Sequence, residues 1–209
     1  NYLSALNCFF DEHPEYKVVH VHQDCLSSVI LKVAARHNVP VRIAHSHNAN
    51  QDRNLKYPIK LWYRRSIPQY ATNLFACGKD AGDWMFSGAP YQIVNNAIDA
   101  TAYTYDPEKR TELRQKLDLR DELTIGHVGR FNPQKNHPFL LDIFASLLEK
   151  EPNAVLLLVG GGEDMPKMQA KAQALDIAKH VRFLGVRSDV ADLMQAMDVF
   201  VFPSLYEGL

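Results

Sequence analysis

The sequence predicts an α/β protein with two lobes, each a doubly wound parallel sheet covered by helices. Short apolar runs alternate with helix-period patterns from one end of the 209-residue chain to the other. One run, AVLLLVGGG at 154–162, has the unbroken apolar character of a strand buried on both faces of a parallel sheet. A polar, turn-rich stretch at 95–107 separates the halves, so we assign residues 1–97 to one lobe and 98–209 to the other.

Strands and helices alternate regularly in the first lobe. A helix from Leu26 to Ala34 is indicated by apolar residues three and four positions apart. The other elements predicted in this lobe are strands at 16–22, 39–47, 72–78 and 91–96, a helical stretch at 56–70 and a short helix at 80–86.

The second lobe repeats the same rhythm. Its clearest helix, 137–152, carries a stripe of six large apolar residues and ends at Pro152. A later helix is expected to be capped by Ser188. The remaining predictions are helices at 107–117 and 165–177 and strands at 123–129, 154–162, 180–185 and 198–203.

Composition bounds the classes of function. With a formal charge of −1, no global field favours nucleic acid, so any anion site must be local. The 3 cysteines are widely spaced and odd in number, which is typical of a reduced, cytoplasmic protein. No apolar run reaches membrane-spanning length, and the N-terminus has no signal-peptide pattern. Both ends are abrupt, so we expect a fragment of a longer protein.

The stretch HVGRFNPQKNH, 127–137, concentrates the local cationic chemistry. Gly129 follows a strand and permits close approach of backbone to a ligand. Arg130 offers a planar fork suited to phosphate, Lys135 a compact cation, and a helix beginning near Asn136 adds its N-terminal amides. Together they would hold a diphosphate; the alternative is two solvated loop cations.

A glycine-rich turn, VGGGED at 159–164, follows another strand. It lacks the G-x-G-x-x-G spacing, and position 182 is Arg where a ribose-binding acid would stand. A dehydrogenase is therefore disfavoured. The turn either lets a ligand approach or simply leads into a helix.

Other candidates lie near strand ends. His45 and His47 follow a first-lobe strand, and we expect their side chains to point in opposite directions, which disfavours joint metal binding. His20 and His22 are expected inside a strand and rank lower. Glu207 could accept hydrogen bonds from a sugar or simply face a helix N-terminus.

The stretch 53–70 mixes cations with aromatic residues. It could meet an anionic membrane surface or a lipid-linked acceptor. The alternative is a helix with a basic solvated face and an aromatic packing face, which we favour because Pro58 interrupts the run. The cations are Arg53, Lys56, Lys60, Arg64 and Arg65.

Taken in order, the segments VNNAID, GHVGRFNPQKNH, LLLVGGGE, VRFLGVRSDV and LMQAMDVFVFPSLYEGL resemble the retaining glycosyltransferases of family 4. The resemblance implies the GT-B architecture, two Rossmann-like lobes, both incomplete here. Within the family the chain looks most like bacterial enzymes of capsule and exopolysaccharide assembly, which would work in the cytoplasm or at the inner face of the membrane.

The resemblance implies roles for residues of this chain. Arg130 and Lys135 match the pair that binds the diphosphate of a nucleotide-diphosphate sugar, with Gly129 allowing close approach. Val186 and Arg187 match the nucleobase region, and Glu207 matches the first glutamate of the Glu-x₇-Glu motif near the donor sugar. His47, or alternatively His45, matches the first-lobe histidine near the reacting centre. The family transfers sugar to a saccharide or lipid-linked hydroxyl with retention and generally needs no metal or other cofactor.

Two departures stand out. Ala97 replaces the glycine usual in the family's linker, which implies a changed hinge turn if that glycine has positive φ. The second glutamate of the motif would lie beyond Leu209, so we expect the fragment alone to have little or no transferase activity. The alternatives are a GT-B sugar-nucleotide 2-epimerase and a non-catalytic nucleotide-sugar-binding lobe.

Overall fold

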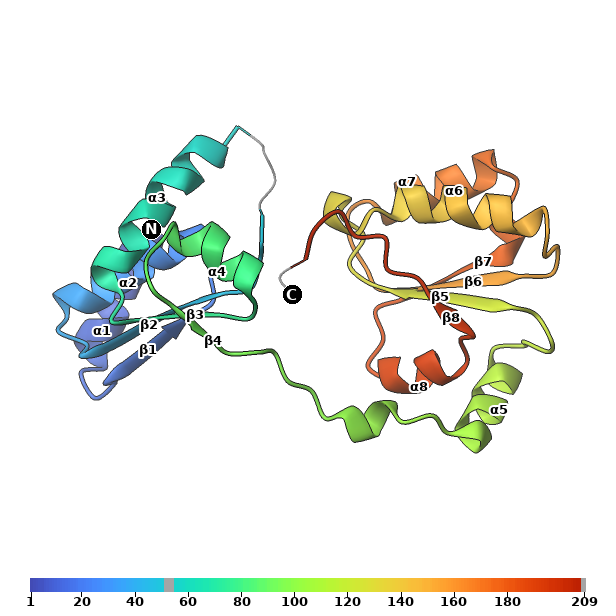
Figure 1. The fold of residues 1–209 in the computed structure, drawn as a ribbon, viewed down its shortest axis with the longest axis horizontal. Helices are drawn as coiled ribbons and strands as arrows, with labels where there is room; N and C mark the ends of the chain where they lie inside the picture. The colour runs from blue at the N-terminus through green and yellow to red at the C-terminus, as the bar shows by residue number, and fades with distance from the viewer. Residues whose placement is uncertain (51–54, 208–209) are drawn as a thin grey trace. The chain divides into compact units, whose positions relative to one another are not determined.

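The chain divides into two compact units in a computed structural model that describes residues 1–50 and 55–207. The first unit comprises Asn1–Ala97 with Tyr206–Leu209, and the second comprises Ile98–Leu205. Each unit contains a parallel sheet packed against helices, so the predicted α/β class is confirmed (Figure 1).

The first unit is built on a four-stranded parallel sheet of order β1-β2-β3-β4. Its strands run in chain order, so right-handed crossovers bring α2, α3 and α4 to one face. Within the described residues of this unit, the chain therefore adds strands in one direction only, without the reversal of strand order that a doubly wound sheet has. The strands are β1 Val18–Val21, β2 Val41–Ser46, β3 Asn73–Ala76 and β4 Gln92–Ile93, and the helices are α1 Tyr2–Glu12, η1 Asp24–Leu26, α2 Ser27–Arg36, α3 Tyr57–Tyr70 and α4 Lys79–Phe86.

Two helices of the first unit differ from their sequence prediction. Helix α2 buries Leu31, Val33 and Ala34, whereas Leu26 lies in η1 and is half exposed. Pro58 does not interrupt the basic stretch, because it occupies the first turn of α3, where its missing N–H costs no hydrogen bond. Arg53, the first cation of that stretch, lies outside the described residues.

The second unit is a four-stranded parallel sheet of order β7-β6-β5-β8. Helices α6 and α7 cover one face and α5 and α8 the other (Figure 1). The strands are β5 Thr124–Val128, β6 Val155–Val159, β7 Val181–Gly185 and β8 Val199–Phe200; the helices are η2 Ala100–Tyr103, α5 Pro107–Lys116, η3 Pro133–Lys135, α6 His137–Leu148, α7 Met165–Ala174, η4 Ala178–His180 and α8 Val190–Gln195.

The strand order of the second unit reverses after β7, when the chain crosses to the far side of β5 and forms β8. This makes the carboxyl ends of β5 and β8 a topological switch point, where ligands of doubly wound sheets bind. The core that supports it is the completely buried strand β6, as the unbroken apolar run predicts. The loops at these strand ends therefore extend from buried central strands.

The linker between the units is largely irregular and contains only the short η2 turn. The described non-glycine residues with positive φ do not include Ala97. The backbone at this position therefore does not require a glycine. None of the helices within residues 1–50 and 55–207 combines the length and apolarity needed to cross a membrane.

Candidate functional site

The loop after β5 is held against the loop after β6 by backbone hydrogen bonds. The Gly129 N–H donates to the Val159 carbonyl at 2.9 Å, and the Phe131 N–H donates to the Gly161 carbonyl at 3.0 Å. A further bond joins the Gly160 N–H to the carbonyl of Gly185, the last residue of β7, at 2.8 Å. Backbone hydrogen bonds thus connect the carboxyl ends of β5, β6 and β7.

The glycine-rich turn is shaped by this contact. Gly160 and Gly162 have φ of +141° and +154°, which side-chain-bearing residues rarely adopt. A Cβ at Gly160 would lie 2.0 Å from the Gly129 carbonyl oxygen, and one at Gly162 would lie 2.4 Å from the Phe131 oxygen. Packing between the two loops therefore explains why positions 160 and 162 are glycines. Neither the ligand-approach prediction nor the simple helix-turn alternative included this packing.

Arg130 and Lys135 both flank Gly129. Arg130 is exposed, whereas Lys135 is half-buried, and a Cβ placed on Gly129 would lie 3.3 Å from Lys135 Cγ. The short turn η3 directs Lys135 back toward the strand end, with the Asn132 side chain accepting from the Lys135 N–H at 3.2 Å. Lys135 Nζ lies 4.7 Å from the centroid of the Phe202 ring, a cation–π contact.

Helix α6 starts at His137, so the predicted start near Asn136 is confirmed. Asn136 itself adopts the left-handed conformation, with φ of 54°, and its side-chain amide donates to the Pro203 carbonyl at 3.2 Å. The first-turn N–H groups of this twelve-residue helix follow directly on the cationic loop. They add a partial positive charge to it.

His127 and His137, two residues with no role predicted from the sequence, lie beneath this loop. The His137 ring stacks on Phe131 at 4.2 Å between centroids and meets the His127 ring edge-to-face at 4.8 Å. Burial, followed by the nearby His127 and Lys135, lowers the pKa of His137 to about 4. A neutral His137 therefore supports the loop as a packing residue. The sequence could have indicated this role, because His137 lies two residues after Lys135, in the first turn of the predicted helix.

Val186 and Arg187 follow β7 and are exposed. The Arg187 guanidinium pairs with both carboxylate oxygens of Asp189, at 2.8 Å from Nε and 2.6 Å from Nη2. The predicted cap by Ser188 is wrong, because α8 begins at Val190 and Asp189 occupies the preceding position. The Asp189 carboxylate is used by Arg187 and makes no side-chain cap hydrogen bond to the helix.

An open depression of about 550 Å³ lies at these strand ends. Four residues predicted from the sequence line it, together with the glycine-rich turn 160–162. They are Gly129, Arg130, Val186 and Arg187. Lys135 is not part of its lining but lies beside Gly129. The depression offers a guanidinium and exposed backbone to an anionic ligand.

The segment after β8 runs beside the cationic loop. The Leu205 N–H donates to the Gln134 carbonyl at 2.8 Å, and His127 Nδ1 is 2.8 Å from the Val201 carbonyl. Glu207, which ends the described chain, groups with the first unit, where its carbonyl accepts from the Ala49 N–H at 3.3 Å. Its side chain is half-buried.

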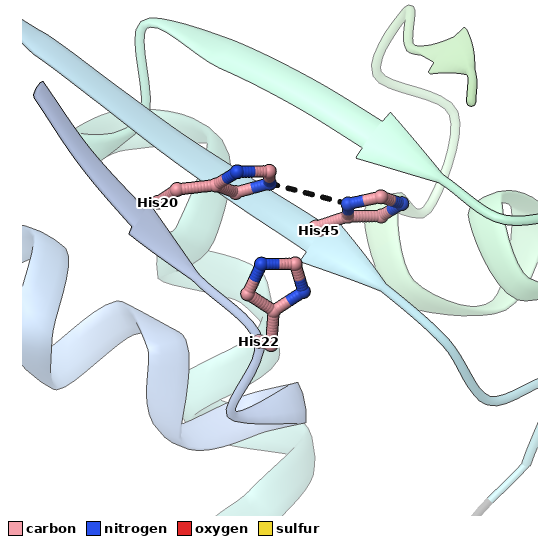
Figure 2. A group of neighbouring side chains, drawn as sticks. All are labelled: His20, His22 and His45. Atoms are coloured by element: carbon pink, nitrogen blue, oxygen red, sulfur yellow. Dashed lines mark hydrogen bonds between the residues drawn. The ribbon is translucent and has the colours of Figure 1, made fainter. Parts of the chain in front are cut away.

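Four histidines of the first unit gather at the carboxyl ends of β1 and β2 (Figure 2 shows three of them). His20 Nε2 lies 3.2 Å from His45 Nδ1, and His22 Nδ1 lies 2.7 Å from His47 Nε2. The His45 and His47 ring centroids are only 4.2 Å apart. We name this group the histidine cluster.

The expectation that His45 and His47 point in opposite directions is wrong. Residues two positions apart lie on the same face of a strand, so these side chains start on one side of β2. The parallel register pairs Val21 with Ala44, which brings the following residues, His22 and His45, side by side. His22 also lies just beyond β1 rather than inside it.

Burial sets the charge of the histidine cluster. His45 is 7 % exposed, and burial followed by the neighbouring His47 lowers its pKa to about 4. His20 and His22 are exposed, but partial desolvation also lowers their pKa, helped by His47 at His20 and by His20 and then His47 at His22. These three imidazoles are therefore neutral at pH 7 and offer lone pairs.

Comparison with solved structures identifies the fold. The crystal structure of HepE from Anabaena in complex with UDP and glucose matches 95 % of this chain and 55 % of its own, with a TM-score of 0.79 and 20 % identity. At that identity the likeness establishes the fold, and the predicted GT-B type is confirmed.

Sequence comparisons point to the same kind of protein. Residues 109–209 match the family described as Glycosyl transferases group 1. A putative glycosyltransferase of Bacillus subtilis (strain 168), EpsF, is 35 % identical over 207 residues, covering 95 % of this chain and 54 % of the relative. An Escherichia coli UDP-Gal:alpha-D-GlcNAc-diphosphoundecaprenol alpha-1,3-galactosyltransferase is 26 % identical over 93 % of this chain and 54 % of its own length. The chain thus spans about half the length of these relatives.

Proposed function

We propose that the protein containing this chain transfers a sugar from a nucleotide-diphosphate sugar to an acceptor hydroxyl, with retention of anomeric configuration. The observation that carries the proposal is the depression of the second unit, where Arg130 and the glycine-rich turn meet at the carboxyl ends of the parallel strands β5 and β6. The nucleotide of the donor binds there, and UDP is the first choice because HepE binds it.

Arg130 and Lys135 act on the leaving group. The acceptor oxygen forms a bond to the anomeric carbon on the face from which the diphosphate departs. The carbon–oxygen bond to the diphosphate breaks, its electron pair stays on the phosphate oxygen, and that oxygen takes the acceptor proton. Two cations and the N-terminus of α6 stabilise the charge that develops, which a divalent ion would otherwise do.

The other site residues bind the rest of the donor. Exposed Val186 and Arg187 flank the nucleobase, and Glu207 accepts hydrogen bonds from hydroxyls of the donor sugar. Of the two first-unit histidines, we assign contact with substrate to His47. Each contacts another histidine, His45 with His20 and His47 with His22, but His45 is buried whereas His47 is only half-buried.

The acceptor we propose is a saccharide on a lipid carrier, in the assembly of a cell-surface polysaccharide in the cytoplasm. The Escherichia coli relative is named for such an acceptor. Helix α3 supports a peripheral contact with an anionic membrane surface, since exposed Ile59 and Trp62 share it with Lys60 and Arg65.

Nucleotide binding tests the donor site directly. In calorimetric titrations of the full-length protein with UDP, Lys135→Ala is expected to weaken binding roughly 10- to 100-fold, the loss of a charge-assisted hydrogen bond. Lys150→Ala, which removes an exposed lysine beyond the far end of α6, is the control. Equal affinity in Lys135→Ala and wild type would remove the diphosphate assignment.

Product analysis tests the reaction. With UDP-sugar and a lipid-linked acceptor, NMR of the product should show the donor's anomeric configuration retained. Donor converted to its C2 epimer would indicate an epimerase, and nucleotide binding without turnover would indicate a binding lobe. Either result would contradict the proposed transfer.

A further inference from the structure

We propose that His20, His22 and His45 form a binding site for a transition-metal dication, with Zn²⁺ as the first candidate. One ligand nitrogen from each of the three side chains lies within 4.8 Å of the others. His20 and His22 come from the end of β1, and His45 comes from the end of β2 (Figure 2). Adjacent paired strands hold the two sides of the site in fixed register.

The spacing of the nitrogens is close to what a metal needs. Ligands 2.0–2.1 Å from a tetrahedral Zn²⁺ are about 3.3 Å from one another. His20 Nε2 and His45 Nδ1 are already 3.2 Å apart. His22 is exposed, so its ring can turn to complete the set without disturbing the core.

The close contacts between ring nitrogens favour a metal over a bound anion, because imidazole nitrogens ligate a metal through their lone pairs. A metal also resolves the crowding of the rings by replacing hydrogen bonds between histidines with shared coordination.

The ligand set selects the kind of metal. Three imidazoles without a carboxylate suit Zn²⁺, Cu²⁺ or Ni²⁺, whereas Mg²⁺ and Ca²⁺ prefer oxygen ligands. His47, whose Nε2 lies 2.7 Å from His22 Nδ1, stands beside the fourth coordination position. This site uses none of the donor-binding residues of the second unit, so it is independent of the proposed role of Arg130 and Lys135.

Metal titration of the untagged full-length protein tests the site. After metal removal, Zn²⁺ is added in competition with a chromogenic chelator, and one equivalent is expected to bind. His20→Ala and His22→Ala should each weaken Zn²⁺ binding more than tenfold, since even residues that only orient a ligand contribute about 10- to 100-fold. His180→Ala removes an imidazole from the second unit and should leave the affinity unchanged.

Both cluster variants replace exposed side chains, so far-UV circular dichroism should show a native fold. Co²⁺ provides an optical check, because its visible absorption should be lost in His22→Ala. The proposal is overturned if the wild type fails to retain Zn²⁺ against the chelator. It is equally overturned if His20→Ala and His22→Ala bind Zn²⁺ as tightly as His180→Ala, which would show adventitious binding elsewhere.

Discussion

Several glycines of the second unit lie where the Cβ of any other residue would overlap a neighbouring atom. At Gly126, within β5, an added Cβ would lie 1.9 Å from the Met197 sulfur. At Gly160 the obstacle is the Gly129 carbonyl, a backbone atom that cannot rotate away. A clash with backbone must move a loop, whereas a clash with a flexible methionine can be relieved by a new rotamer.

The first prediction concerns Gly160→Ala. Positive φ strain and the 2.0 Å contact with Gly129 should together lower the free energy of unfolding by about 2–4 kcal/mol. Gly185→Ala is the matched control, since it also has positive φ but nothing within 4 Å, and should cost about 1 kcal/mol. Urea denaturation followed by far-UV circular dichroism measures both, and equal losses would contradict the backbone clash.

Single residues show what sequence could and could not predict about the site. Arg130 and Val186 could be placed at strand ends because each directly follows a predicted strand. The histidine cluster could not be predicted, since it depends on the register of β1 against β2, which no local pattern encodes. The expectation for His45 and His47 also misapplied the two-residue period of a strand.

At the level of elements, one carboxylate connects α5, β5 and β8. Asp198 immediately precedes β8 and accepts from the Thr124 N–H at 2.8 Å and from Arg110 Nη2 at 2.6 Å. Arg114, also on α5, places its Nη1 3.4 Å from Asp198 Oδ2, the oxygen that also accepts from Thr124. Burial by itself raises the pKa of Asp198, but the Thr124 N–H and the two guanidiniums outweigh it and lower the pKa.

The second prediction is that Asp198→Asn destabilises the second unit at pH 7 by about 1–3 kcal/mol, through loss of charge-assisted hydrogen bonds. Glu112→Gln, which removes an exposed ion pair with Lys116 on the same helix, should cost about 0.5 kcal/mol or less. Urea unfolding of both variants makes the comparison. Similar effects would show that Asp198 contributes no more than a surface pair.

The pH dependence of this contribution has a definite sign. The Asp198 carboxyl has a folded pKa below its ordinary value of 3.8, so its stabilisation is complete well above that value. The stabilisation falls as pH drops from about 3.8 through the folded pKa. The stability difference between wild type and Asp198→Asn should therefore shrink below pH 4. A constant difference down to acid unfolding would contradict the assignment.

Elements of the second unit were predictable to different degrees. Strand β6 follows from an unbroken apolar run, and α6 follows from its stripe of large apolar residues. The order β7-β6-β5-β8 does not follow from any local pattern, because strand neighbours are chosen by crossovers between distant segments. The interruption predicted at Pro58 failed because a proline that breaks a helix interior is tolerated in its first turn.

At the scale of the whole molecule, the chain contains two units with separate cores. The buried cluster around Leu31, Ile67 and Phe86 lies entirely in the first unit. The cluster around Leu140, Phe144 and Leu156 lies entirely in the second. The chain passes between the units twice, after Ala97 and after Leu205. Because each unit has its own core, each can unfold cooperatively without the other.

The last prediction is that the units unfold in separate transitions and that UDP stabilises only the second. Both tryptophans, Trp62 and Trp84, lie in the first unit, so their fluorescence reports its unfolding alone. Circular dichroism reports both units. At 100 times its dissociation constant, UDP should add about 2.7 kcal/mol to the second transition and leave the fluorescence transition unchanged. Coincident transitions, or a UDP shift seen in fluorescence, would show that the two cores unfold as one.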